Sequence, residues 1–369
     1  MDISVCVPNG KYQGSFSNTL LKKVRALISL RFVAVISALL VIIPILIILA
    51  SFLQPASEVW QHIVDTLLID LLKNTFILCI GVLAGTFSLG VGAAWLTAVC
   101  DFPGRKFFNW ALMLPLAIPT YVFAFVFIGL LDFSGPVQTL LRTQLASSPK
   151  WFPNIRSAGG VIFVMSLALY PYVYLLARNA FQTQGNRVLE VSQALGQSQT
   201  SAFFKAALPM ARPWIAGGLM LVLMETLADF GAVSIFNYDT FTTGIYKAWF
   251  GFFSLTAAAQ LSSVLLLFVL VIIIIEQRMR SRMQFHQVGR LSLASNRLQL
   301  NGWSKWAACV SLMSIVMVAF IIPCLQLIVW STASISVELD SRYLGLLFRS
   351  LLFSSMAATL ITSLGLLLA

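Results

Sequence analysis

The sequence has 369 residues, of which 59% are hydrophobic and only 10% are charged. A typical soluble domain has about 45–50% apolar and about 25% charged residues, so this composition excludes an ordinary water-soluble protein. Apolar runs long enough to cross a bilayer, roughly 20 residues per helix, recur along the whole chain. We therefore expect an all-α fold, a polytopic transmembrane helical bundle in the lipid bilayer. The net charge of +11 does not indicate a nucleic-acid partner, because the Lys and Arg residues stand between the apolar runs.

The apolar runs predict eight membrane-spanning helices. We place them at residues 32–53, 74–99, 108–131, 159–179, 212–236, 254–276, 306–330 and 347–369. The first run is longer than the 7–15 residues of a signal-peptide core, so the N-terminal segment is expected to stay attached. Most of the 24 Lys and Arg residues fall on the side that holds the N-terminus. The positive-inside rule therefore places the N-terminus in the cytoplasm.

Two parts of the chain resemble each other. Residues 71–94 align without gaps with residues 346–369, and the alignment pairs Gly90 with Gly365. This similarity indicates an internal repeat in which the second helix of a unit occurs twice. Chance similarity between two Leu-rich helices is the alternative.

A real repeat predicts two helical units in one chain. The second unit shows only two helices, so we expect the chain to be a truncated form or fragment of a longer, two-unit protein. The predicted parts are a cytoplasmic N-terminal segment (1–31), a first six-helix unit (32–276), a cytoplasmic basic linker (277–305) and an incomplete second unit (306–369).

A long polar loop, residues 180–211, separates the fourth and fifth predicted spans on the cytoplasmic side. Its apolar positions predict two short amphipathic helices that are separated near Gly196, the second ending before Pro209. Small residues such as Ala194 and Gly196 at a helix end can insert closely into a cleft on a partner. The loop is therefore expected to be a structured docking element rather than a disordered linker.

The spacing of Glu190, Gly196, Leu208 and Pro209 resembles the loop motif of the permeases of bacterial ATP-binding-cassette importers. In that family the loop is a coupling helix that sits in a groove of a separate ATPase subunit. The resemblance implies the same role for residues 190–209 and a location in the bacterial inner membrane. The sequence departs from the usual Ala, Ala and Ile of the motif at Val191, Ser192 and Ala206.

The chain is not expected to be an enzyme. It has no phosphate-binding Gly-x-x-x-x-Gly-Lys-Ser/Thr motif, since its one Gly-Lys pair, Gly10-Lys11, is followed by Tyr12. We predict no catalytic residues and no cofactor in this chain. ATP hydrolysis is expected on the partner.

Glu225 and Asp229 stand four residues apart in the fifth predicted span, which would place them on one helix face. A carboxylate at membrane depth costs about 2.5–3.5 kcal/mol on insertion scales, so both should avoid lipid. One interpretation is that they line the translocation pathway or its gate. The other is that they hydrogen-bond neighbouring helices.

Residues 101–125, 224–231, 240–251 and 257–261 are similar to the iron(III) importer permeases within this family. The resemblance implies that a periplasmic binding protein delivers ferric iron, that cassette ATPases bind below, and that two six-helix halves are fused. It implies no metal site in this chain, whose two histidines, His62 and His286, are far apart. Permeases for thiamine, sulfate, polyamines or phosphonates remain alternatives, and a secondary transporter is a further one.

Overall fold

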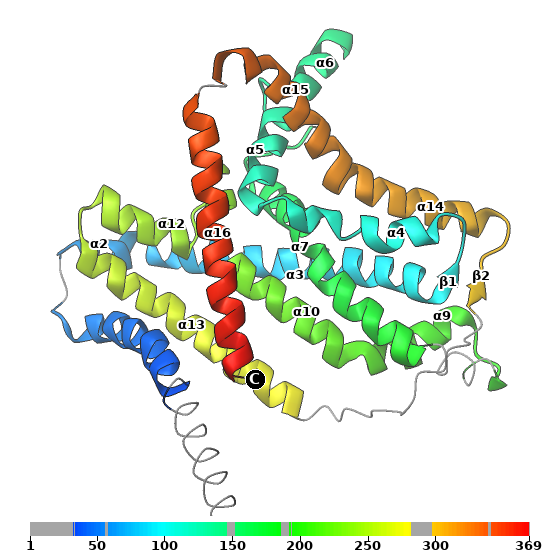
Figure 1. The fold of residues 1–369 in the computed structure, drawn as a ribbon, viewed down its shortest axis with the longest axis horizontal. Helices are drawn as coiled ribbons and strands as arrows, with labels where there is room; N and C mark the ends of the chain where they lie inside the picture. The colour runs from blue at the N-terminus through cyan, green and yellow to red at the C-terminus, as the bar shows by residue number, and fades with distance from the viewer. Residues whose placement is uncertain are drawn as a thin grey trace, which may run out of the picture. The chain divides into compact units, whose positions relative to one another are not determined.

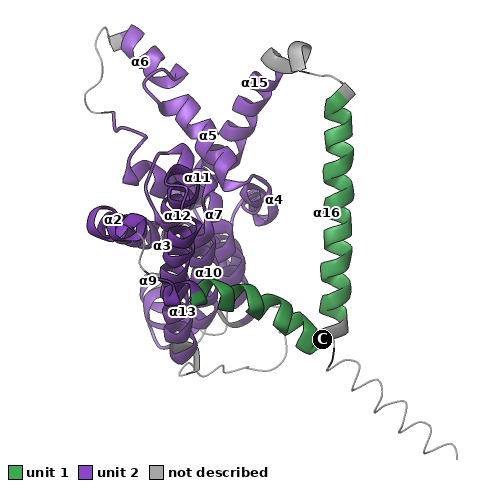
Figure 2. Cartoon of the chain, turned by 90° about the vertical axis from the view of Figure 1, so that its left-hand side faces the viewer, with its two compact units in different colours: residues 1–50, 333–369 green, residues 51–332 purple. Residues whose placement is uncertain are grey.

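The computed structural model describes residues 32, 34–55, 58–145, 152–185, 192, 194–281, 297–338 and 341–368. These residues are almost entirely helical (Figure 1). The chain forms two compact units, one of residues 1–50 and 333–369 and the other of residues 51–332 (Figure 2).

The predicted all-α membrane fold is confirmed. Among the described residues, eight helical stretches are long and apolar enough to cross a membrane: Ala34–Leu53, Leu68–Val99, Thr120–Gln144, Ala158–Thr183, Phe203–Ala228, Leu255–Arg278, Trp303–Thr332 and Arg342–Leu366.

Shorter elements connect these spans. The α-helices in chain order are α2 (Glu58–Thr66), α3 (Leu68–Val99), α4 (Arg105–Ala111), α5 (Thr120–Leu131), α6 (Pro136–Leu145), α7 (Ala158–Ala180), α9 (Gln199–Ala202), α10 (Leu208–Ala228), α11 (Gly231–Ile235), α12 (Phe241–Tyr246), α13 (Leu255–Ser281), α14 (Trp303–Val316), α15 (Ile322–Glu338) and α16 (Ser341–Leu368). The 3₁₀-helices are η1 (Ser51–Leu53) and η2 (Leu114–Ala117), and the π-helical turns are η3 (Phe181–Gly185), η4 (Phe203–Ala207), η5 (Lys247–Gly251) and η6 (Met317–Ile321). Two short strands, β1 (Cys100–Asp101) and β2 (Leu298–Gln299), pair in parallel.

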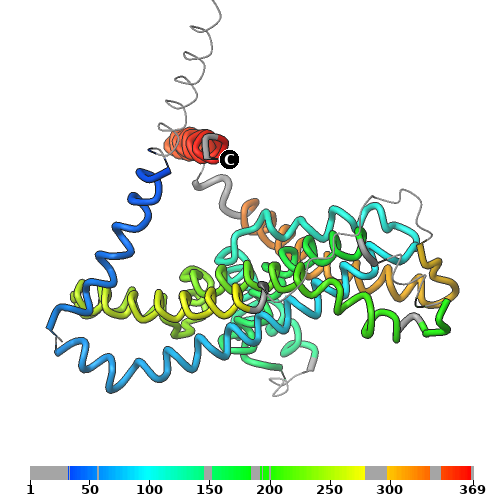
Figure 3. Tube along the Cα trace, turned by 90° about the horizontal axis from the view of Figure 1, so that it is seen from below, coloured from blue at the N-terminus to red at the C-terminus, as the bar shows by residue number. Residues whose placement is uncertain are grey.

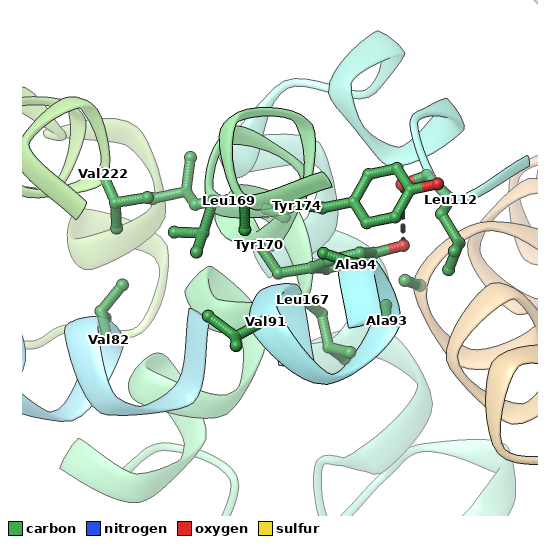
Figure 4. Packing of buried hydrophobic residues seen from close by; sticks show 14 of the residues in the cluster. Val82, Val91, Ala93, Ala94, Leu112, Leu167, Leu169, Tyr170, Tyr174 and Val222 are labelled. Carbon is green, nitrogen blue, oxygen red and sulfur yellow. Dashed lines mark hydrogen bonds between the residues drawn. The ribbon is translucent and has the colours of Figure 1, made fainter. Parts of the chain in front are cut away.

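The main core of residues 51–332 lies where α7 packs against α3, α10 and α5. Its buried side chains include Val82 and Val91 of α3 and Leu167 and Tyr170 of α7 (Figure 4). A second, smaller core joins α2 and the start of α3 to α12 and α13 through Ile63, Leu71, Phe241 and Leu261. Figure 3 shows these four elements gathered at one end of this unit, away from β1 and β2.

Small residues on α3 allow the backbones of α3 and α7 to approach closely. A Cβ atom added at Gly90 would lie 2.8 Å from Val173 Cβ and 3.0 Å from the backbone oxygen of Tyr170. Small residues at crossings are how membrane helices gain close packing without a hydrophobic driving force between them.

Replacing Gly90 by Ala should therefore lower the free energy of unfolding by about 1–3 kcal/mol, the usual cost of overpacking. Gly92 is the matched control, because it lies on the same helix, is exposed and has no atom within 4 Å of an added Cβ. Thermal unfolding of both variants in detergent measures the difference. Equal midpoints for Gly90→Ala and Gly92→Ala would contradict the packing argument.

The prediction of one span over residues 108–131 is wrong. The helix stops at Ala111, a 3₁₀ turn follows over Leu114–Ala117, and α5 begins only at Thr120. Pro115 and Pro119 cause the break, because each lacks an N–H donor and disfavours helical backbone in the preceding residue. The apolar span of this region instead extends over Thr120–Gln144.

Two tyrosines of α7 bind carbonyl groups that this break leaves without a partner inside the helix. Tyr170 Oη donates to the Leu112 carbonyl at 2.9 Å, and Tyr174 Oη donates to the Asn109 carbonyl at 3.2 Å. Figure 4 shows both rings beside Leu112. Away from water, an unbonded carbonyl is costly, so these hydroxyls stabilise the break.

Removing the Tyr170 hydroxyl in Tyr170→Phe should cost about 1–3 kcal/mol of unfolding free energy, because the buried Leu112 carbonyl loses its partner. Tyr121→Phe is the control, since Tyr121 is 52% exposed. The unfolding midpoints of the two variants in detergent give the comparison. A Tyr170→Phe midpoint equal to that of Tyr121→Phe would show that the hydrogen bond contributes nothing.

β2 and α14 both pack onto the main core of residues 51–332. β2 pairs with β1, Leu300 N donates to the Asp101 carbonyl at 3.2 Å, and Leu312 and Val316 of α14 are buried in the main core. The first helix after the predicted linker therefore packs on helices of the predicted first unit.

Candidate ATPase-coupling loop and membrane carboxylates

The loop between α7 and α10 is the first candidate site. α7 ends in the π-helical turn η3, and the chain returns through α9 and η4 directly into α10. Glu190 lies outside the described residues. Ala194 is exposed, and Leu208 and Pro209 form the first turn of α10.

The predicted end of a helix before Pro209 is wrong, because the helical backbone continues into α10. Pro209 stands at the start of α10, where its missing N–H is tolerated. The preceding π-helical turn, in which Leu208 N donates to the Phe203 carbonyl, widens the helix at this point. The loop is thus connected to α10 without a flexible joint.

Gly196 forms the turn of this loop. Its φ is 76°, in the left-handed region that costs other residues roughly 1–2 kcal/mol. Gln197 N donates to the Ser192 carbonyl at 3.0 Å and closes the turn. No atom lies within 4 Å of a Cβ added at Gly196, so the requirement for Gly here is conformational.

Leu195 is an exposed apolar side chain at the tip of the same turn. It is 75% exposed, and its neighbours Ala194, Gly196 and Gln197 are also exposed. Leu195 could not be predicted from the sequence, because one Leu in a loop carries no periodic signal. Its position beside the Gly196 turn is what makes it a candidate contact.

Asp229 is not on the same helix face as Glu225, contrary to the prediction. α10 ends at Ala228, and the backbone of Asp229 is extended. Its Oδ2 accepts from Thr120 Oγ1 at 2.6 Å, and its Oδ1 accepts from Ala232 N at 2.9 Å and Val233 N at 3.2 Å. The carboxylate thus supplies acceptors to the N–H groups at the start of α11 and connects them to the first residue of α5.

Glu225 has a different environment. It is exposed on α10, and it lies close enough to Tyr172 of α7 for the two groups to interact electrostatically. Within the described part of the chain, no hydrogen bond or ion pair holds its carboxylate. The two carboxylates therefore differ in their surroundings. Asp229 accepts hydrogen bonds from α5 and α11, whereas Glu225 is exposed.

The described residues contain no group of three or more His, Cys, Asp or Glu side chains that could hold a metal ion. His62 lies in α2, where its ring meets Phe252 edge-on at 6.0 Å between centroids. His286 lies outside the described residues.

The family described as binding-protein-dependent transport system inner membrane component matches residues 86–284. This match covers more than half of the chain and includes both the loop and Glu225. The chain belongs to this family. It is a multi-pass inner-membrane permease of an ATP-binding-cassette importer.

Individual relatives of this permease differ in what they transport. It is 30% identical over 295 residues to the Fe(3+)-transport system permease protein FbpB 2 of Haemophilus influenzae, covering 79% of this chain and 54% of that protein. It is 25% identical to the molybdate/tungstate permease WtpB of Pyrococcus abyssi over 61% of this chain and 83% of that one. A 27% match to the sulfate permease CysT of Salmonella typhimurium covers 39% of this chain and 50% of that protein. The permease thus spans about half the length of the iron relative.

A solved structure shares the fold. A bacterial ABC transporter involved in the import of the acidic polysaccharide alginate matches with a TM-score of 0.57 and 18% identity. The match covers 72% of this permease and 99% of that chain. At this identity the likeness concerns the fold alone.

Charged groups cluster where the end of α3 meets β2 in this permease. Arg105 Nε lies 3.3 Å from Asp101 Oδ1, and Gln299 Nε2 donates to Asp101 Oδ2 at 3.2 Å. Burial, and after it the positive charge of Arg105, lowers the pKa of Arg297. Burial also raises the pKa of the neighbouring Cys100 thiol to about 11, so this thiol stays protonated near neutral pH. These contacts and the pairing of β1 with β2 connect residues 298–299 to the end of α3.

Proposed function

We propose that this permease imports ferric iron and docks on separate cassette ATPase subunits through residues 190–209, with a periplasmic binding protein delivering the substrate. The single observation that carries the docking role is the exposed turn at Leu195 and Gly196. Its backbone requires Gly at the family's motif position, and its exposed apolar tip suits insertion into a partner's groove. The N-terminus and this loop then both face the cytoplasm.

The charge of Glu225 favours a cation as the substrate. An exposed, unpaired carboxylate on a membrane span needs a watery or protein-lined surrounding rather than lipid. A negative charge there would repel molybdate and sulfate, the substrates named for two other relatives, and would attract ferric iron. Carboxylate and phenol oxygens, as in Glu225 and Tyr172, also suit a hard cation. We assign Glu225 to the pathway and Asp229 to holding α5 and α11 together.

The two-unit organisation remains part of this proposal, with a first unit over residues 32–276, a linker over 277–305 and a second unit beginning at 306. α16 supports it, because most of its large apolar side chains between Tyr343 and Leu366 are exposed. A helix that is apolar all round needs lipid or other membrane helices around it. The same holds for the first candidate span, Ala34–Leu53, whose apolar side chains are mostly exposed.

Uptake of radiolabelled substrates by the source cells tests the proposed substrate. Cells that lack the gene for this chain should take up ferric iron at a much lower rate, whereas their molybdate and sulfate uptake should be unchanged. Restoring the gene should restore iron uptake. Normal iron uptake in the deleted cells, or a selective loss of molybdate or sulfate uptake, would overturn the assignment.

A further inference from the structure

Both ends of the proposed coupling loop carry a phenylalanine in a π-helical turn. η3 begins at Phe181, directly after α7, and η4 begins at Phe203, directly before α10. Such turns are rare and are found frequently at functional sites. In Figure 1 the end of α7 and the start of α10 lie beside the last part of α3, and η3 contacts both α3 and η4.

Trp95 of α3 joins these two phenylalanines. Its ring lies 5.5 Å from Phe181, with the planes at 86°, and 4.5 Å from Phe203, with the planes at 62°. Phe181 and Phe203 are themselves 6.2 Å apart. Each ring therefore contacts the other two. Trp95 meets both phenylalanines in the edge-to-face geometry that aromatic pairs prefer, and the planes of Phe181 and Phe203 are tilted by 51°. We call Trp95, Phe181 and Phe203 the aromatic triad.

The rings of the triad are buried or partly buried, unlike the exposed turn at Leu195 and Gly196. Phe181 is 1% exposed, and Trp95 and Phe203 are partly buried against the main core. Ala202 and Ala207, on either side of Phe203 in the chain, are also buried. The next residue, Phe204, is 65% exposed and contacts Phe203 at 4.8 Å. Two adjacent phenylalanines thus differ in that only Phe203 faces Trp95.

A displacement of the loop reaches these rings, because Phe181 and Phe203 stand in the turns at its two ends. Packed interiors are dense, so Phe181 and Phe203 cannot shift without moving Trp95. α3 is one unbroken helix from Leu68 to Val99, and its Gly90 is in tight contact with α7 at Val173. A movement of Trp95 is therefore carried along α3 as a rigid element rather than absorbed locally.

We infer that the aromatic triad transmits movement of the ATPase-docked loop to the membrane helix α3, with Trp95 as the receiving residue. This inference rests on the proposed function, since it assumes that the loop docks on an ATPase. We treat them as positioning residues, because their rings contact one another and the main core rather than the exposed turn. Their role is to make ATP hydrolysis and helix movement depend on each other.

The test substitutes the triad in the chromosomal gene and purifies the transport complex through a tag on this chain. Three quantities are measured: the amount of ATPase retained, the stimulation of ATP hydrolysis by substrate-loaded binding protein, and iron uptake by the cells. Trp95→Ala and Phe203→Ala should retain the ATPase within about twofold, because the exposed turn at Leu195 is unchanged. Iron uptake should fall at least about tenfold, which corresponds to ~1.4 kcal/mol of lost coupling free energy. Stimulation by loaded binding protein should be lost in both.

Phe87→Ala is the matched control, because Phe87 also lies on α3, is 37% exposed and stands outside the docking loop, so it should behave as the wild type in all three measurements. Trp95→Phe keeps an aromatic ring and should restore most of the uptake. If Trp95→Ala does not accumulate, Phe203→Leu removes the ring contacts while keeping an apolar side chain of similar size, and it should give the same pattern.

The inference is overturned if the triad variants keep normal stimulation and uptake, or if they lose ATPase retention in proportion to uptake. Lower thermal stability with unchanged stimulation for each ATPase bound would show a merely structural cluster, and would also overturn it. Failure of the wild-type chain to retain any ATPase is a separate result, which would refute the docking function itself.

Discussion

Replacing Leu195 by Asp is expected to abolish most of the association between this permease and the ATPase proposed to dock on it. A charge at the tip of the loop would have to be desolvated in the partner's groove, and losing a hot-spot side chain near the centre of an interface costs about 2 kcal/mol or more. A loss of this size lowers the affinity roughly 30-fold. Leu195 is 75% exposed, so the substitution should leave the fold intact.

Gly196→Val should have a similar effect through the backbone. Its φ of 76° is disfavoured for a β-branched residue, so the turn that presents Leu195 would change its shape. Gly302→Val is the matched control, because Gly302 also has a positive φ, of 61°, and open space around an added Cβ, but lies before α14. It should retain the ATPase.

Co-purification of the ATPase with tagged permease measures both effects, and thermal unfolding of each variant confirms that the chain is folded. Wild-type retention of the ATPase by folded Leu195→Asp and Gly196→Val chains would refute docking through this turn. Equal loss in Gly302→Val would show that the effect comes from backbone strain anywhere in the chain.

The number of spans could be predicted from the sequence, because each apolar run is about as long as a helix that crosses a bilayer. The turn at Gly196 was also predictable, since a Gly between two short amphipathic segments commonly separates helices. The break at residues 112–119 was not, although Pro115 and Pro119 were visible. Prolines are tolerated inside membrane helices when neighbours satisfy the freed groups, and α7 keeps Pro171 within an unbroken helix. Which proline breaks a helix depends on partners such as Tyr170, which are far away in sequence.

The roles of the carboxylates were unpredictable for a related reason. A spacing of four residues places two side chains on one face only if the helix continues through both. Here α10 ends before Asp229, whose carboxylate finds donors on α5 and at the start of α11. The aromatic triad likewise joins residues from three helices, and no local pattern indicates that Trp95 would meet Phe181 and Phe203.

Removing the charge of Glu225 is expected to reduce iron uptake by at least about tenfold, which requires only ~1.4 kcal/mol. Two unit charges 4 Å apart interact by about 4 kcal/mol at an effective dielectric constant of 20, so one carboxylate near a passing cation can supply this effect. Glu225→Gln keeps the size and polarity of the side chain and removes only the charge. Glu225→Arg should reduce uptake further, because it reverses the sign.

Asp229→Asn provides the contrast between a pathway carboxylate and one that holds helices together. It replaces one carboxylate oxygen by an NH₂ group, which donates hydrogen bonds and cannot accept them. The Asn side chain therefore cannot accept from both Thr120 and the α11 backbone, and the unfolding midpoint should fall. Glu225→Gln should leave the midpoint and ATPase retention unchanged while uptake falls. Normal iron uptake by Glu225→Gln cells would remove Glu225 from the pathway, and with it the electrostatic reason to prefer iron over an oxyanion.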